Sequence, residues 1–143
     1  SEIFKAENVA GVKVYMDHTT GELIINDEDA LRKIFTQNKI VLVHGEGENI
    51  ILAKKLIQKS DNSLYICHLS SKMELDYAKQ DKIKNDVYVE VCPHHLFLSG
   101  KDLNELGNYA EMKPGLKTVE DSRASFARDT VQVKSIRPSA RWR

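Results

Sequence analysis

The chain has 143 residues, with 21 Lys plus Arg, 21 Asp plus Glu and a formal net charge of zero. That length suffices for one domain with its own core, and the charge balance argues against a protein that coats nucleic acid. No apolar run approaches the roughly 20 residues that span a bilayer, and the start lacks the layout of a signal peptide. Two cysteines are too few for a disulfide framework, so we predict a cytoplasmic setting without nucleic acid or membrane partners.

Taken in chain order, the sequence alternates between strand and helix patterns. The predicted strands are 11–16, 40–44, 64–68 and 87–91, and the predicted helices are 28–35, roughly 46–59 and 72–80. Asp27 is predicted to cap the first helix, and Ser71 with Glu74 forms a predicted capping box for the third. This alternation predicts an α/β fold whose parallel strands form an open sheet or part of a closed barrel.

Polar residues recur at the strand ends. His44 and His68 each come last in an apolar strand, and Lys13 lies within an earlier strand. Strand alternation predicts that His68 shares a side with Leu64 and Ile66, and that Cys67 faces away from the strand-end site as a core residue. Polar residues that recur once in each strand–helix unit, near the carboxyl ends of parallel strands, are typical of the catalytic face of a barrel.

Each of these residues has two interpretations. A strand-end histidine is either a hydrogen-bonded structural group or a zinc ligand, and two on consecutive strands favour the metal. A lysine in a buried strand is costly, so Lys13 is expected to be paired, neutral or chemically modified.

Several segments resemble one known family, the cyclic amidohydrolases. Residues 41–46 (VLVHGE) resemble its fifth-strand motif, and 64–71 (LYICHLSS) resemble the sixth. The Pro-His-His-Leu form within 89–96 is similar to the seventh-strand motif of dihydroorotases, whereas allantoinases and hydantoinases more often carry Pro-His-Tyr-Leu. Residues 11–16 resemble the strand with a carboxylated lysine, and 111–117 resemble the family's Lys-Met-Asn-Pro-Pro-Leu-Arg.

The resemblance implies a fold and a chemistry. The fold would be a partial (β/α)8 TIM barrel, covering roughly βα units 4 to 7 with parallel strands. The family is a set of zinc hydrolases with two metal ions, in which Lys13 would be the carboxylated bridging ligand and His44 and His68 would hold one zinc. His95 and Lys113 would contact a small cyclic amide substrate. The implied reaction is the reversible conversion of dihydroorotate to carbamoyl-aspartate in pyrimidine biosynthesis, with an allantoinase or hydantoinase type as an alternative.

Two family features are missing from these 143 residues. No histidine precedes Lys13, so the first-strand His-x-His pair is absent, and so is the eighth-strand motif with the proton-shuttling aspartate. We therefore identify no catalytic residue, expect at most one zinc, and predict that the isolated chain is incomplete and inactive. The predicted partial barrel covers 1–126, and 127–143 form a divergent basic tail expected to pack poorly.

Three explanations stay open at this point. The chain is a fragment or frame-damaged product of a longer enzyme, or a half-barrel that another copy or a different chain closes. The third is a non-catalytic scaffold or partner subunit that needs no metal.

Overall fold

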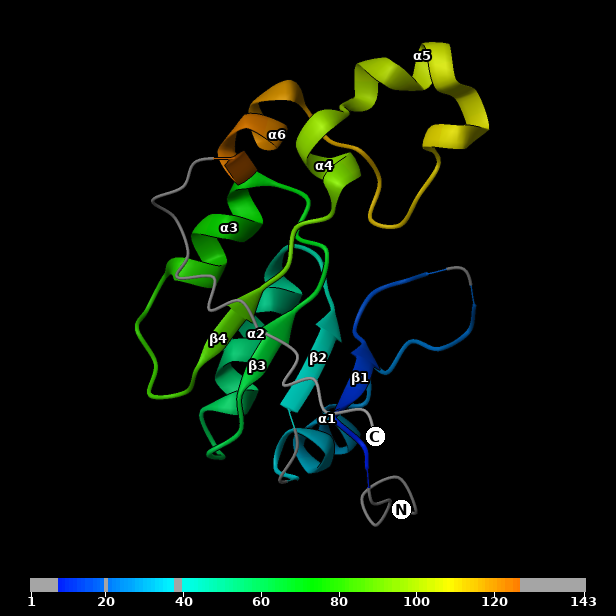
Figure 1. The fold of residues 1–143 in the computed structure, drawn as a ribbon. Helices are drawn as coiled ribbons and strands as arrows, with labels where there is room; N and C mark the ends of the chain where they lie inside the picture. Colours follow the sequence, from blue (N-terminus) through cyan, green and yellow to red (C-terminus); the bar gives the residue numbers. More distant parts are fainter. Residues whose placement is uncertain (1–7, 20, 38–39, 127–143) are drawn as a thin grey trace, which may run out of the picture.

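The computed structural model describes residues 8–19, 21–37 and 40–126 (Figure 1). The predicted basic tail, 127–143, lies outside the described residues. Strands and helices alternate along the described chain, in the order β1 (Gly11–Tyr15), α1 (Glu28–Phe35), β2 (Ile40–His44), α2 (Glu48–Ile57), β3 (Leu64–Ile66), α3 (Lys72–Lys79), β4 (Val87–Val89), α4 (Pro93–Phe97), η2 (Gly100–Asp102), α5 (Leu103–Leu106), η3 (Gly107–Ala110) and α6 (Val119–Phe126).

The four strands form one sheet in the order β1-β2-β3-β4, and every neighbouring pair is parallel. The predicted strands are confirmed, although β3 and β4 end two residues earlier than expected. The register aligns Lys13 with Leu42, Tyr65 and Tyr88 across the sheet. All four strands thus present their carboxyl ends at the same edge.

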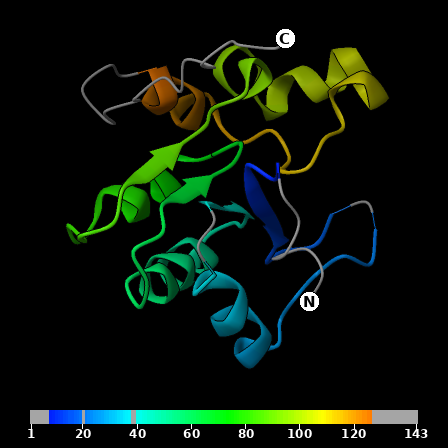
Figure 2. The same ribbon diagram turned by 60° about the horizontal axis from the view of Figure 1, so that its bottom comes forward.

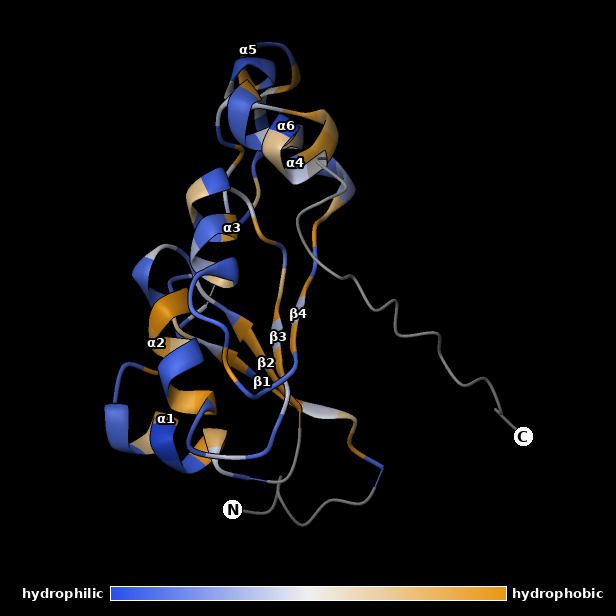
Figure 3. Cartoon of the chain, turned by 90° about the vertical axis from the view of Figure 1, so that its left-hand side faces the viewer, coloured by the Kyte–Doolittle hydropathy of each residue, from blue (hydrophilic) through white to orange (hydrophobic). Residues whose placement is uncertain are grey.

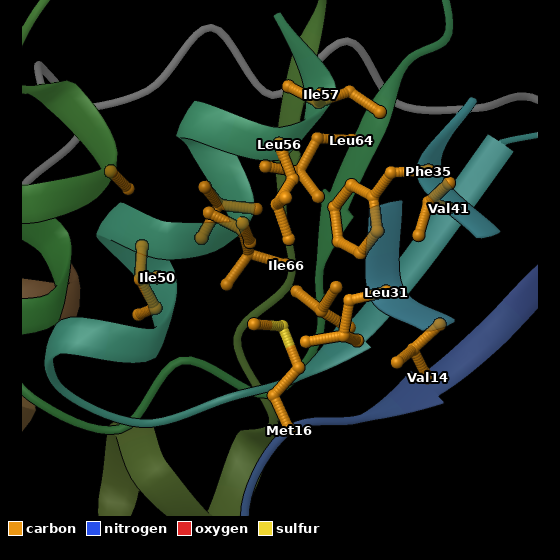
Figure 4. Close-up of a cluster of buried hydrophobic side chains, with 14 of the residues drawn as sticks. Val14, Met16, Leu31, Phe35, Val41, Ile50, Leu56, Ile57, Leu64 and Ile66 are labelled. Carbon is orange, nitrogen blue, oxygen red and sulfur yellow. The ribbon is translucent and has the colours of Figure 1, made fainter. Parts of the chain in front are cut away.

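Helices α1, α2 and α3 lie on one side of the sheet (Figure 3). Alternate residues of the strands point toward them and form the core with apolar helix residues (Figure 4). The buried strand residues are Val12, Val14, Val41, Val43, Leu64, Ile66 and Val89, and the helices supply Leu31, Phe35, Ile50, Ala53, Leu56, Ile57, Leu75 and Ala78. In the described part of the chain no helix packs on the opposite face, which carries the stacked rings of Tyr65 and Tyr88.

The helix starts follow the predicted caps. The Asp27 carboxylate accepts from the Ala30 amide at 2.8 Å, and the Ser71–Glu74 capping box is present. Both predicted caps are confirmed.

A second group of helices lies beyond the carboxyl ends of the strands. Figures 1 and 2 both show α4, α5 and α6 gathered there, apart from α1 and α2. The Asp121 carboxylate of α6 accepts from the Lys72 amide at 2.8 Å and so ties α6 to the start of α3. None of the helices in the described ranges has the length and apolar character of a bilayer-spanning segment.

Lys54 is a buried lysine, 5% exposed, that the sequence analysis did not single out. From α2 its ammonium donates to the carbonyls of Tyr77 at 3.1 Å and Ala78 at 2.9 Å, and also to that of Gln80. Burial lowers its pKa. Because the last carbonyls of a helix have no partner within the helix, Lys54 serves as a cap for α3 supplied by α2.

We predict that Lys54→Met destabilises the fold by about 1–3 kcal/mol, because the substitution removes the donor of one buried and two partly buried hydrogen bonds. Urea denaturation followed by circular dichroism measures this. Lys55→Met, at the neighbouring exposed position, is the matched control and should change stability little. Equal stability of the two variants would contradict the capping role.

Candidate metal centre at the carboxyl ends of β2 and β3

His44 and His68 meet at the carboxyl edge of the sheet. His44 is the last residue of β2, and His68 follows β3 by two positions. The Nδ1 atom of His44 lies 2.8 Å from the Nε2 atom of His68, and the ring centroids are 4.6 Å apart. Two imidazole nitrogens from adjacent strands therefore face each other.

The meeting depends on a break in strand alternation at His68. Leu64 and Ile66 are fully buried in the core on the helix side, so continued alternation would send His68 to the same side. His68 instead has a φ of 39°, in the left-handed region that residues other than glycine seldom adopt. The prediction that His68 shares a side with Leu64 and Ile66 is wrong, because this backbone turn redirects the side chain toward His44.

Burial favours the neutral form of His68. Burial, with smaller contributions from His44 and Lys13, lowers the pKa of His68 to about 4. His44 is 1% exposed. A neutral imidazole offers a lone pair, which is the form that binds metal ions. Within the described residues, neither Nε2 of His44 nor Nδ1 of His68 has a hydrogen-bond partner.

Lys13 lies near this pair but is not buried. Its side chain is exposed on the uncovered face of the sheet, and its Nζ is 5.5 Å from the centroid of the Tyr15 ring. The expectation of a buried lysine is wrong, because no described helix covers that face. Lys13 is nevertheless close enough to His68 and Cys67 to act on the pKa values of both.

Cys67 and Glu90 belong to the same neighbourhood, and sequence reasoning missed them. Burial raises the pKa of the Cys67 thiol, Lys13 opposes this, and Glu90 adds to it. Cys67 is buried, as predicted, but it lies among charged groups and does not face away from the site. The parallel register could have predicted that Cys67 and Glu90 lie side by side. They follow the aligned residues Tyr65 and Tyr88 by two positions.

The two predicted substrate contacts lie on the segment beyond the strands. His95 is 3% exposed, and its Nε2 lies 3.1 Å from the carbonyl oxygen of Pro114. Lys113, next to that proline, is exposed. His95 therefore holds the loop that presents Lys113.

Carboxylates hold the loops that carry the histidines. Glu74 Oε2 accepts from the amides of Ser70 and Ser71 at 2.9 and 3.0 Å and from the Ser70 hydroxyl at 3.1 Å. Its other oxygen accepts from the Gly47 amide at 3.3 Å. Glu74 is itself 3% exposed, so one buried carboxylate fixes the loops after both β2 and β3.

A second carboxylate joins the loops after β1 and β2. Asp17 Oδ2 accepts from the Glu46 amide at 2.5 Å and from the Asn49 side chain at 3.0 Å. The Glu46 side chain in turn accepts from Lys117 at 3.0 Å. The edge of the sheet is therefore held by polar contacts between segments distant in sequence.

The donor set fits a zinc ion with a small adjustment. With zinc–nitrogen bonds of about 2.0–2.1 Å, two ligands of a tetrahedral ion lie about 3.3 Å apart. His44 Nδ1 and His68 Nε2 are 2.8 Å apart, so the rings need to separate by only about half an ångström. Two facing imidazole nitrogens suit this ion once the proton between them moves to an outer ring nitrogen, Nε2 of His44 or Nδ1 of His68.

Curated relatives share this stretch of sequence. The chain is 30% identical over 125 residues to the multifunctional protein pyr1-3 of Dictyostelium discoideum and 29% identical over 124 residues to the multifunctional protein CAD of Squalus acanthias. Each match covers 83% of this chain and 6% of the relative. A dihydroorotase of Methanosarcina acetivorans is 27% identical over 156 residues, covering 81% of this chain and 33% of that enzyme.

The chain resembles the dihydroorotases of the cyclic amidohydrolase superfamily. This dihydroorotase-like chain spans about a third of the length of the Methanosarcina enzyme and far less of the multifunctional proteins. No family model matches it.

Solved structures agree on the fold. A D-hydantoinase from Bacillus sp. AR9 matches with a TM-score of 0.74 at 17% identity, covering 87% of this chain and 36% of the hydantoinase. A D-hydantoinase (dihydropyrimidinase) from Thermus sp. matches with a TM-score of 0.72 at 16% identity, covering 87% and 35%. Together with the parallel βα alternation, this gives the dihydroorotase-like chain the fold of a partial (β/α)8 barrel, as predicted.

We predict that Glu74→Ala destabilises the chain by about 2–3 kcal/mol, because it removes a charged acceptor from several buried donors at once. Urea denaturation measures the loss. Glu105→Ala, at an exposed position of α5, is the control and should stay within about 0.5 kcal/mol of the wild type. A small effect at Glu74 would show that the loops after β2 and β3 do not depend on it.

Proposed function

We propose that this chain is βα units 4 to 7 of a dihydroorotase-like cyclic amide hydrolase and carries part of its zinc site. The observation that supports this most strongly is the pair of facing nitrogens of His44 and His68 at the carboxyl edge of a parallel sheet. In (β/α) barrels that edge is the catalytic face. The sequence similarity to dihydroorotases adds the reaction class. We place the activity in the cytoplasm, in pyrimidine biosynthesis.

His44 and His68 would hold one zinc ion, and Lys13 would be the bridging ligand. For that role the Lys13 amine, once deprotonated, adds to carbon dioxide and loses a second proton, so that a cation becomes an anionic carbamate. The exposed position of Lys13 leaves its amine open to carbon dioxide and solvent. A zinc ion bound there would lower the pKa of a coordinated water and polarise the amide carbonyl.

Lys113 and His95 would serve the substrate. Lys113 offers an exposed ammonium that suits an anionic ring substrate such as dihydroorotate. His95 would act as a positioning residue, because its ring binds the Pro114 carbonyl beside Lys113. Hydantoinase and allantoinase substrates are the alternative within the same reaction type.

These residues by themselves would not complete the catalytic cycle. The sequence offers no counterpart to the family's first-strand histidines or to its proton-shuttling aspartate. We propose that a further segment or a partner chain, identical or different, supplies them and closes the barrel over the uncovered face of the sheet. The competing function is a scaffold or partner subunit without metal.

We predict that the histidine pair of the full chain binds a zinc ion of its own. Competition with a chromophoric chelator measures the affinity. His68→Asn should weaken it by about tenfold or more, because loss of a ligand costs at least as much as loss of a ligand's hydrogen-bond partner. His18→Asn, at an exposed histidine in a polar loop, is the control and should leave the affinity unchanged. If the two variants bind zinc alike, the metal assignment fails and the scaffold function gains support.

We also predict that the zinc-loaded chain alone shows no dihydroorotate turnover above background. The absorbance change between dihydroorotate and carbamoyl-aspartate measures this in both directions. Turnover that His68→Asn abolishes would contradict the proposed inactivity and would locate the missing proton acceptor within these residues.

A further inference from the structure

A second group of metal-ligating side chains lies where β4 runs into α4. Cys92, His94 and His95 each offer a ligand atom, and these atoms all lie within 4.8 Å of one another. Cys92 and His94 are partly buried, and His95 is 3% exposed. The group comes from one continuous segment and shares no residue with Lys13, His44 or His68.

The hydrogen bond of His95 fixes which of its nitrogens is free. A carbonyl oxygen only accepts, so the Nε2 atom 3.1 Å from the Pro114 oxygen must carry the proton. The Nδ1 atom of the neutral ring then holds a lone pair. This atom is buried, and no group in the described ranges donates a hydrogen bond to it. Such a nitrogen beside a thiol and a second imidazole has the chemistry of a metal ligand, and its orientation is already set by the hydrogen bond of the other ring nitrogen.

We propose that Cys92, His94 and His95 bind one thiophilic divalent ion, of which zinc is the representative. In a tetrahedral zinc site, a sulfur and a nitrogen ligand lie about 3.6 Å apart and two nitrogens about 3.3 Å apart. The upper limit of 4.8 Å therefore requires a closure of at most about 1.5 Å, which rotation of the partly exposed Cys92 and His94 side chains supplies. Three protein ligands leave a fourth position for water.

The Glu90 carboxylate lies beside the Cys92 thiol, which must lose its proton when a metal ion binds. The Cys92 sulfur lies 3.9 Å from a Glu90 oxygen, and burial together with this carboxylate raises the pKa of the thiol. Metal binding breaks the S–H bond and forms a metal–sulfur bond, and the proton passes to solvent, with the neighbouring Glu90 carboxylate as its first acceptor. Because both imidazoles bind in the neutral form, each ion releases one proton. The thiolate selects zinc-like ions over magnesium or calcium.

The site would link the sheet to the loop that carries Lys113. Cys92 directly follows the strand region, and His95 holds the Pro114 carbonyl through its other nitrogen. A bound ion would fix the ring of His95 and, through it, that loop. The inference shares His95 with the proposed hydrolase, but its ligand set includes neither His44 nor His68.

The test uses cobalt titration of the full 143-residue chain after metal removal. A thiolate bound to cobalt gives a near-ultraviolet charge-transfer band that imidazole or carboxylate ligands do not give. We expect this band in the wild type, its loss in Cys92→Ser, and its retention in Cys67→Ser. The two cysteines are matched controls for each other, because both are free. His94→Asn should weaken cobalt binding by about tenfold, whereas His18→Asn should not.

Absence of the band from the wild-type chain, or its persistence in Cys92→Ser, would overturn the proposal. Far-ultraviolet circular dichroism checks that each variant folds. X-ray absorption of the zinc-loaded wild type gives an answer without any variant, since it should show sulfur at about 2.3 Å. A zinc shell of nitrogen and oxygen alone would also overturn the proposal, while leaving the histidine pair of the hydrolase intact.

Discussion

The parallel register of β1 to β4 is the constraint on which the remaining structure depends. It places the carboxyl end of every strand at one edge, so residues separated by 20 to 30 positions meet there. The crossover helices between parallel strands must return along the sheet, and here α1, α2 and α3 all pack on one face. The apolar strand residues therefore pack into the core on that face, and the polar ones lie at the edge and on the opposite face.

The loops at this edge are held mainly by buried or partly buried acidic groups. Glu74 and Asp17 accept hydrogen bonds from backbone amides of loops that follow different strands. A charged acceptor makes stronger bonds than a neutral one, and it fixes a loop without needing apolar bulk. Charged side chains also bind backbone groups at both ends of α3. Lys54 of α2 caps its last turn, and Asp121 of α6 accepts from an amide of its first turn.

Local sequence signals predicted the elements and part of the site. The four strands, the Asp27 cap and the Ser71–Glu74 capping box depend on neighbouring residues, and each was found where expected. The convergence of His44 and His68 followed from the rule that parallel strands end at one edge. Three other features could not be read from local pattern, because each depends on contacts across 20 or more residues. They are the capping of α3 by Lys54, the proximity of Cys67 to Glu90, and the contact of Glu74 with the loop after β2. Alternation also failed at His68, since a single left-handed residue redirects a side chain without any sign in hydrophobicity.

That left-handed residue has an evolutionary consequence. Glycine or asparagine adopts such a backbone more readily than histidine, so loop stability and the imidazole impose opposing selection at position 68. In the proposed zinc site, selection for metal binding retains histidine despite the strained backbone. Once that selection relaxes, drift toward glycine or asparagine relieves the loop and removes the proposed ligand in one substitution. A lineage of this fold that has abandoned metal chemistry should therefore show the loss first at position 68, while the buried His44 and the core strands still look like those of an enzyme.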